Sequence, residues 1–242
     1  MRILVTRPEP DASAMKARLE ALGHEVSLAP LLHIEPIAIE ARSLAGAQAI
    51  IATSRNGLRA LGASKALALA LKLPLFAVGP GTADLARQLE FQRVISGAGT
   101  ACDLVPVIAA AADPAKGPLL HVAGDVIAFD IGAALSKHGF EVRALTAYRA
   151  VAAASLSASV AESIADGRID AVILMSPRSA DIFAQVVARA GIERDARQLV
   201  FLCLSQAVAD ALQGLAPARV EIAEAPNSVA MLAAVGRLAS HR

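Results

Sequence analysis

The chain has 242 residues, 55% of them hydrophobic and 19% charged, and its mean hydropathy is +0.53. The most apolar windows, 66–78 and 104–112, are interrupted by Lys72 and Pro74 or are far shorter than the roughly 20 residues of a transmembrane helix. A net charge of +1 and 3% aromatic residues exclude a strongly basic or aromatic surface for nucleic acid. Because the amino terminus also lacks the apolar stretch of a signal peptide, we expect a cytoplasmic protein with neither a membrane nor a nucleic-acid partner.

Short apolar runs alternate with amphipathic helical patterns along almost the whole chain. The runs are nearly continuous instead of alternating, which is typical of parallel strands covered by helices on both faces. In chain order, the predicted strands are residues 3–6, 25–29, 49–53, 75–79, 93–96, 119–123, 141–144, 171–176, 199–205 and 220–223. The sequence therefore predicts a parallel α/β protein.

Internal repeats divide these strands into two sheets. The pattern of residues 2–26 returns at 118–142, and the pattern of 49–96 returns at 171–223. Two strands of the first kind and three of the second make a five-stranded sheet, so the chain predicts two domains. The repeats alone permit either consecutive or exchanged pairing of the units.

The connectors favour the exchanged arrangement. Residues 30–36 and 144–150 occupy the same repeat position, and both look extended. If they pair as linker strands, residues 39–147 form an inserted domain, 1–35 with 151–242 form the other, and 36–38 and 148–150 are the linkers. We thus expect two similar parallel-sheet (flavodoxin-like) α/β/α domains, joined by two extended linker strands, with a cleft between them.

Several motifs in their order and spacing resemble the uroporphyrinogen-III synthase family, although none is specific alone. They are Val5-Thr6-Arg7-Pro8, Leu22-Gly23-His24, Pro30-Leu31-Leu32-His33-Ile34-Glu35-Pro36, Ala52-Thr53-Ser54-Arg55-Asn56-Gly57-Leu58, Val78-Gly79-Pro80-Gly81-Thr82-Ala83, Thr146-Ala147-Tyr148-Arg149 and Met175-Ser176-Pro177-Arg178-Ser179-Ala180. The resemblance covers nearly the whole chain. It implies the exchanged domain arrangement with substrate in the cleft.

The resemblance also implies a reaction. A cofactor-free, cyclising lyase of tetrapyrrole (haem and porphyrin) biosynthesis would convert linear hydroxymethylbilane into uroporphyrinogen III, with loss of water and inversion of ring D through a spirocyclic intermediate. The substrate carries eight carboxylates. We expect a monomer that uses no cofactor and no metal.

Tyr148 is the candidate catalytic residue. It is the only tyrosine, and it falls on the second connector. The resemblance implies that a tyrosine in this motif assists departure of the substrate hydroxyl, a task for a weak acid. The alternative is an interdomain packing aromatic whose hydroxyl is bonded locally.

The substrate carboxylates require hydrogen-bond donors. Ligands of open α/β sheets bind beyond the carboxyl ends of the strands, where this sequence offers hydroxyls, glycines and helix starts. Each Ser, Thr or Asn there is also explained as a helix N-cap. The candidate substrate-binding residues are Arg7, Thr53, Ser54, Asn56, Gly79, Thr82, Ser176, Ser179 and Ser205.

Other functional classes have weaker support. A dinucleotide site at 78–83 lacks the third glycine, which is replaced by Asp84. Cys102 and Cys203 have no metal-ligand spacing and are expected to be reduced thiols. The alternative from another class is a non-enzymatic two-lobed module that closes on an anionic small molecule.

Overall fold

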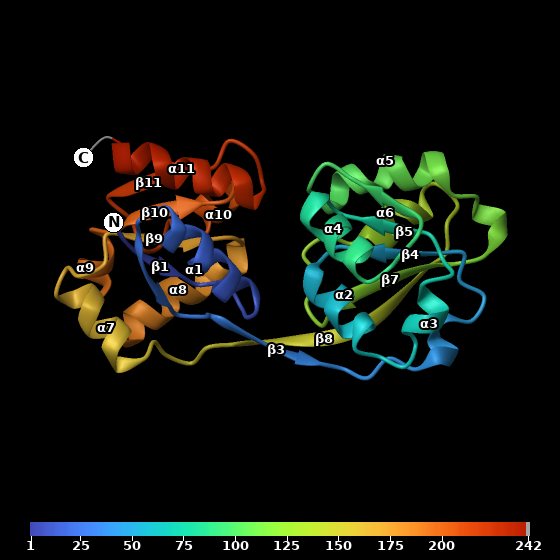
Figure 1. Ribbon diagram of the computed structural model, residues 1–242, viewed down its shortest axis with the longest axis horizontal. Helices are drawn as coiled ribbons and strands as arrows, with labels where there is room; N and C mark the ends of the chain where they lie inside the picture. Colours follow the sequence, from blue (N-terminus) through green and yellow to red (C-terminus); the bar gives the residue numbers. More distant parts are fainter. Residues whose placement is uncertain (241–242) are drawn as a thin grey trace. The chain divides into compact units, whose positions relative to one another are not determined.

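The structure is a computed structural model that describes residues 1–240, and the chain divides into two compact units (Figure 1). Unit 1 contains Met1–His33 and the described residues from Val151 onward, and unit 2 contains Ile34–Ala150. All ten predicted strands are present, together with one short strand in the first connector. Both units are parallel α/β sandwiches, which confirms the predicted fold class.

Unit 1 is built around a five-stranded parallel sheet. Its strands lie in the order β11-β10-β9-β1-β2, which is 2-1-3-4-5 when counted along the chain within the unit, the flavodoxin-like order. The first segment of the chain therefore pairs with the last, β1 lying beside β9. The elements are β1 (Arg2–Val5), α1 (Asp11–Ala21), β2 (Glu25–Leu28), α7 (Ala158–Ala165), β9 (Ala171–Leu174), α8 (Pro177–Arg189), α9 (Glu193–Ala196), β10 (Val200–Cys203), α10 (Gln206–Asp210), β11 (Arg219–Ile222) and α11 (Ser228–Ser240).

Unit 2 repeats this arrangement, with β7 and β8 in the places of β1 and β2. Its sheet order is β3-β8-β7-β4-β5-β6, and the five strands from β8 to β6 are parallel. The elements are the 3-10 helix η1 (Ala41–Leu44), β4 (Ala49–Ala52), α2 (Arg55–Gly62), α3 (Leu67–Ala70), β5 (Leu75–Ala77), α4 (Pro80–Gln88), β6 (Val94–Ser96), α5 (Ala101–Ala111), the 3-10 helix η2 (Pro114–Lys116), β7 (Leu119–Gly124), α6 (Ile131–Ser136) and β8 (Val142–Ala152).

The two connectors are extended and lie side by side, as predicted. β3 (Leu32–Pro36) neighbours β8 in the sheet, and Ile37 N–H donates to the carbonyl of Ala147 over 2.8 Å. The expected linker 36–38 begins at Pro36, the last residue of β3. The expected linker 148–150 lies inside β8, because this strand continues without interruption from Val142 to Ala152.

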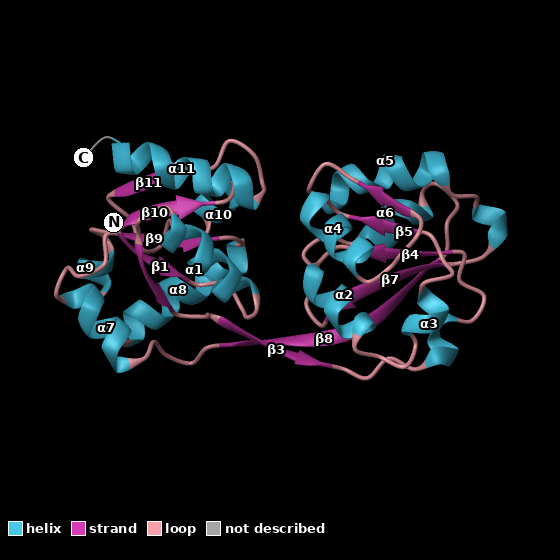
Figure 2. Cartoon of the chain, in the orientation of Figure 1, coloured by secondary structure: helices cyan, strands magenta, loops and turns pink. Residues whose placement is uncertain are grey.

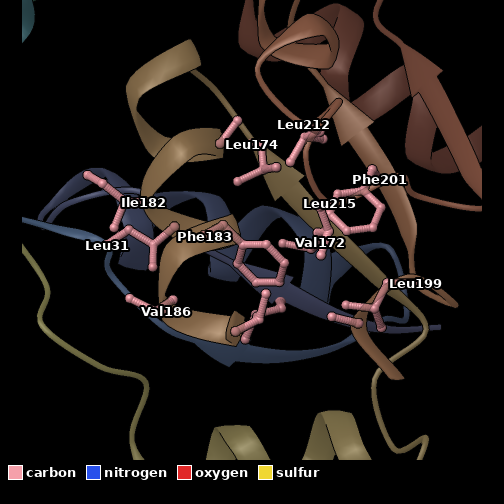
Figure 3. Close-up of a cluster of buried hydrophobic side chains, with 14 of the residues drawn as sticks. Leu31, Val172, Leu174, Ile182, Phe183, Val186, Leu199, Phe201, Leu212 and Leu215 are labelled. Atoms are coloured by element: carbon pink, nitrogen blue, oxygen red, sulfur yellow. The ribbon is translucent and has the colours of Figure 1, made fainter. Parts of the chain in front are cut away.

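Helices cover both faces of each sheet (Figure 2), so the strands are buried on both sides. β4 and β9 are buried at every position, and alternate residues enter opposite cores because strand side chains alternate. On one face of unit 1, Phe183 of α8 meets Phe201 of β10 edge to face, with ring centroids 5.7 Å apart (Figure 3). Among residues 1–240, no helix is both long and apolar enough to cross a membrane.

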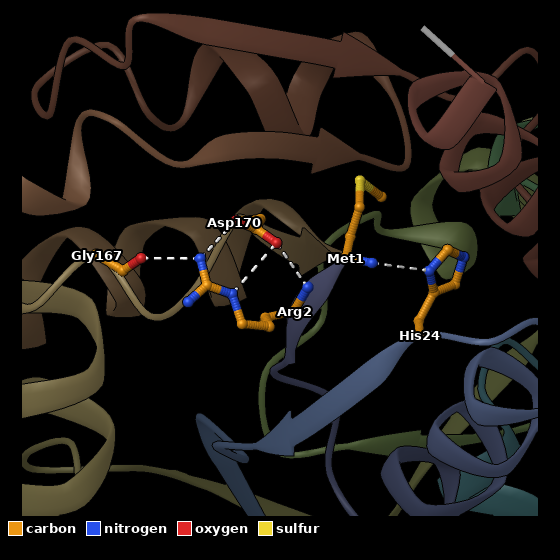
Figure 4. Close-up of polar contacts among 5 residues, drawn as sticks. All are labelled: Met1, Arg2, His24, Gly167 and Asp170. Carbon is orange, nitrogen blue, oxygen red and sulfur yellow. Dashed lines mark hydrogen bonds and ion pairs between the residues drawn. The ribbon is translucent and has the colours of Figure 1, made fainter. Parts of the chain in front are cut away.

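Polar contacts join the two chain segments of unit 1 at the amino-terminal edge of its sheet (Figure 4). Arg2 Nη2 lies 2.9 Å from Asp170 Oδ1, and the Arg2 backbone N–H donates to Asp170 Oδ2 over 2.7 Å. Arg2 Nη2 also donates to the carbonyl of Gly167 over 2.9 Å. Because residues 2 and 170 are far apart in sequence, these bonds help to hold β1 against the strand that follows Asp170.

Candidate functional site

Each sheet has one place where the direction of strand winding reverses, and open α/β sheets bind ligands outside the strand carboxyl ends there. In unit 2 this switch point lies between β7 and β4. Thr53 and Ser54 directly follow β4, and Gly124 is the last residue of β7. The topology therefore brings two of the predicted residues to the switch point of unit 2.

Ser54 has two partners. It is the N-cap of α2, and its Oγ accepts the N–H of Gly57 over 3.1 Å. The same Oγ lies 3.0 Å from the hydroxyl of Tyr148, across 94 positions of sequence. Ser54 is thus a helix N-cap, and it also lies beside the candidate acid.

Tyr148 lies on β8 directly opposite Gly124. The register of β7 and β8 shifts between Ala123 and Gly124, so that Gly124 pairs with Tyr148. A Cβ added at Gly124 would lie 2.7 Å from Cζ and 2.9 Å from the hydroxyl oxygen of Tyr148. Only a glycine leaves room for the phenol ring to lie against β7 and reach Ser54.

Thr53 is bound to a buried histidine. Thr53 Oγ1 lies 2.9 Å from Nε2 of His121, which is 3% exposed in β7. Burial lowers the pKa of His121, and the opposing effect of the Asp130 charge is smaller. The imidazole is therefore held in its neutral form, with one ring nitrogen able to accept and the other able to donate.

Three further candidates of unit 2 occupy helix starts. Asn56 Oδ1 accepts a hydrogen bond from Arg59 Nη1 over 2.9 Å. Gly79 precedes α4, and a Cβ there would lie 2.9 Å from the Cα of Gly99, so two loops approach closely at this point. Thr82 lies in the first turn of α4 and is 7% exposed.

Unit 1 holds its candidates at equivalent places. Ser176 caps α8: its Oγ accepts the N–H of Ser179 over 3.1 Å and lies 2.8 Å from Ser179 Oγ. Ser205 stands at the N-cap position of α10, where its side chain makes no capping hydrogen bond. Ser179 is 5% exposed and Ser205 is half-buried.

Arg7 follows β1 at the switch point of unit 1. Its Nη2 lies 2.9 Å from Asp11 Oδ2, and its Nη1 donates to Ser228 Oγ over 3.3 Å. Both side chains of the ion pair are largely buried, with 13% of Arg7 and 8% of Asp11 exposed. The guanidinium charge is therefore already offset by a carboxylate, whereas the sequence predicts Arg7 only as a ligand for a substrate carboxylate.

Two residues at the unit 2 switch point were also missed. His121 belongs to an apolar strand run, and nothing in the sequence signals its contact with Thr53. Asp125 follows Gly124: its N–H donates to the carbonyl of Tyr148 over 3.0 Å, and its Oδ1 accepts the N–H of Ala150 over 3.1 Å. Asp125 thus holds the backbone at the Tyr148 carbonyl and two residues further along β8.

The described residues contain no group of three His, Cys, Asp or Glu side chains that could hold a metal ion. A surface hollow of about 470 Å³ is found in unit 1, but it lies at the amino-terminal edge of the sheet, opposite the switch point. It is lined by Met1, Arg2, Gly23, Glu25, Asp170 and Ala239. We therefore place the candidate site by topology and side-chain chemistry.

A sequence model of a family described as Uroporphyrinogen-III synthase HemD matches residues 13–233. No curated protein sequence matches the chain. A mutant uroporphyrinogen III synthase from the extremely thermophilic bacterium Thermus thermophilus is similar in structure, with a TM-score of 0.62 and 21% identity over 100% of both chains. The uroporphyrinogen-III synthetase from Helicobacter pylori 26695 has a TM-score of 0.65 and 16% identity, over 98% of this chain and 100% of that one. At these identities the two structures support the fold alone.

Proposed function

The chain belongs to the uroporphyrinogen-III synthase family, and from this premise we propose which of its residues act on the substrate. The activity is a lyase reaction of tetrapyrrole biosynthesis, the cyclisation of hydroxymethylbilane to uroporphyrinogen III with loss of water and inversion of ring D. Nothing in the family match supports the alternative of a non-enzymatic binding module.

We propose Tyr148 as the general acid for loss of the substrate hydroxyl. Its phenol proton passes to that hydroxyl, the carbon–oxygen bond breaks and water departs. The substrate that remains is an azafulvene cation. The far pyrrole attacks at its substituted α-carbon, and the spirocyclic intermediate fragments and recloses. The proton released when the ring regains aromaticity returns to the phenolate, so the net change is the loss of water.

The observation that carries this assignment is the place of the Tyr148 hydroxyl. It lies at the carboxyl edge of the unit 2 sheet, beside the switch point, 3.0 Å from the Oγ of Ser54 at the start of α2. A polar, half-buried phenol at this edge suits proton donation. Much of the remaining chemistry is intrinsic to the substrate, so the chief task of the protein is to orient a flexible chain.

We propose that hydroxyls and backbone N–H groups at the helix starts hold the eight substrate carboxylates. The chain has a net charge of only +1, so no general positive field would retain such an anion. Arg7 would share its donors between Asp11 and a substrate carboxylate. The proposed contacts are Arg7, Thr53, Asn56, Gly79, Thr82, Ser176, Ser179 and Ser205.

We also propose that the enzyme acts as a monomer in the cytoplasm, without a cofactor. Both cysteines are free thiols, as is usual in a reducing compartment. Burial raises the pKa of Cys203 to about 12, which makes this thiol inert. Gel filtration with light scattering tests the oligomeric state.

The test of the function supplies freshly made hydroxymethylbilane, oxidises the products and separates the isomers. We expect the type III isomer; formation of the type I isomer alone, the spontaneous product, would contradict the assignment. Tyr148→Phe should remain folded and lower kcat by about a hundredfold, the low end of the contribution of a general acid. An unchanged kcat would remove Tyr148 as the proton donor.

A further inference from the structure

Ser54 has one proton, and its capping bond does not use it. A hydroxyl can donate once and accept twice. The backbone N–H of Gly57 can only donate, so it occupies one lone pair of Ser54 Oγ at 3.1 Å. The proton of Ser54 is therefore available to the second partner of this oxygen, the Tyr148 hydroxyl 3.0 Å away.

The direction of this second hydrogen bond decides what Tyr148 can do. If Tyr148 donated to Ser54, its proton would be committed to the protein. If Ser54 donates to Tyr148, the phenol proton is left for the substrate. Ser54 stands at the amino end of α2, where the backbone N–H groups carry partial positive charge, and the N–H of Gly57 further polarises the serine hydroxyl towards donation.

We propose that Ser54 is a positioning residue that donates its proton to the Tyr148 oxygen, and so aims the phenol proton at the leaving hydroxyl. When that proton has moved, the same O–H of Ser54 stabilises the phenolate. From the sequence, Ser54 is predicted to bind the substrate directly, whereas its place in the structure suits action through Tyr148. The inference rests on the proposed role of Tyr148 as the acid.

The backbone around Tyr148 supports this division of roles. Gly124 lets the ring lie against β7, and Asp125 binds the carbonyl of Tyr148 and the N–H of Ala150. The backbone is thus held at the Tyr148 carbonyl and just beyond it, and Ser54 provides the one hydrogen bond that we find at the hydroxyl itself within residues 1–240. Loss of Ser54 should release the hydroxyl without moving the strand.

A double-mutant cycle tests the inference, using Ser54→Ala, Tyr148→Phe and the double variant. The Tyr148 oxygen becomes charged during the reaction, and a hydrogen bond to a charged oxygen is stronger than one to a neutral oxygen. Ser54→Ala should therefore lower kcat about tenfold to a hundredfold, with KM nearly unchanged. In the Tyr148→Phe background the same substitution should change kcat by less than about twofold, because its partner oxygen is gone.

Each other outcome overturns something specific. Equal losses in both backgrounds, or a raised KM with unchanged kcat, would overturn the role of Ser54 and leave Tyr148 as the acid. If Tyr148→Phe has the kcat of the wild type, the assignment of the acid fails, and the inference fails with it.

A spectroscopic measurement separates positioning from folding. Tyr148 is the only tyrosine, and the chain has no tryptophan. When tyrosine is labelled on its ring, the NMR signal therefore comes from Tyr148 alone and reports on the surroundings of its hydroxyl. Ser54→Ala should shift the signal, and Ser54→Thr, which keeps a hydroxyl and can cap a helix, should restore both the signal and kcat.

Ser157→Ala is the matched control, because Ser157 caps α7 by accepting the N–H of Val160 over 3.4 Å and belongs to unit 1, whereas Tyr148 belongs to unit 2. It should lower the melting temperature to a similar degree and leave the tyrosine signal in place. An unshifted signal in Ser54→Ala would refute the proposed hydrogen bond.

Discussion

Gly124→Ala is expected to disable the site by crowding one ring. The added Cβ would lie 2.7 Å from Tyr148 Cζ, 2.8 Å from Cε2 and 2.9 Å from the hydroxyl oxygen. Ordinary contacts begin at 3.4 Å, so the ring has to retreat by about 0.7 Å before Cζ, at 2.7 Å, reaches one. These atoms belong to a rigid ring, and no rotation about a terminal bond can relieve them together.

A movement of this size is enough to break the hydrogen bond between Ser54 and Tyr148. The Ser54–Tyr148 bond of 3.0 Å is lost once its atoms are about 3.6 Å apart. A misplacement of about 1 Å near the chemistry can cost on the order of a hundredfold, so we expect kcat to fall at least about tenfold. Overpacking costs about 1–3 kcal/mol of folding stability, which corresponds to a melting temperature lower by several degrees.

The assay is cyclisation of hydroxymethylbilane with separation of the isomers, run well below the melting temperature of the variant. Gly214→Ala is the control, since a Cβ there has no neighbour within 4 Å, and it should behave as the wild type. If Gly124→Ala retains wild-type kcat and an unshifted tyrosine NMR signal, the ring does not lie against Gly124 and the described geometry is wrong.

Two further predictions concern the cores. Phe183→Ala should lower the free energy of unfolding of unit 1 by about 3–5 kcal/mol, because the ring is fully buried and packs edge to face on Phe201. Urea unfolding measures this loss. Leu22→Ala, at a 57% exposed position, is the control, and an equally small loss in both variants would contradict the prediction. Burial lowers the pKa of His121 below its ordinary 6.5. Between the two pKa values, His121 therefore binds a proton in the unfolded chain but not in the folded one. The free energy of unfolding should thus fall as the pH decreases from 6.5 towards the lowered pKa. His121→Asn should remove the contribution of His121 to the pH dependence of unfolding, measured with urea on both sides of pH 6.5. The contribution of His24, whose pKa is also lowered by burial, should remain. An identical pH dependence in the variant would show that His121 is not held neutral.

The sequence by itself determined ten of the eleven strands formed by residues 1–240. Runs such as Ala49–Ala52 and Ala171–Leu174 are short and apolar at every position, which is typical of strands buried on both faces. The repeat then showed that there is material for two sheets. Placement of Ser54 and Ser176 at helix starts was likewise predictable, because capping depends on residues only three positions apart.

The partners of these elements were harder to predict. Either pairing of the repeated units buries the same apolar faces, and only the extended connectors favoured the exchange that places β1 beside β9. The i,i+4 spacing of Arg7 and Asp11 permits an ion pair, but an arginine at a strand end is equally suited to bind an anion, so the sequence does not decide between the two.

Only the tertiary structure decided what the site contains. Ser54 meets Tyr148 across 94 residues, and Thr53 meets His121 across 68, through side chains on separate strands and loops. Sequence patterns report which face of a strand or helix is buried, since that depends on near neighbours. The contact between two particular hydroxyls depends on strand order, on the register shift at Gly124 and on the missing Cβ there, and these are set only when the whole sheet of unit 2 has assembled.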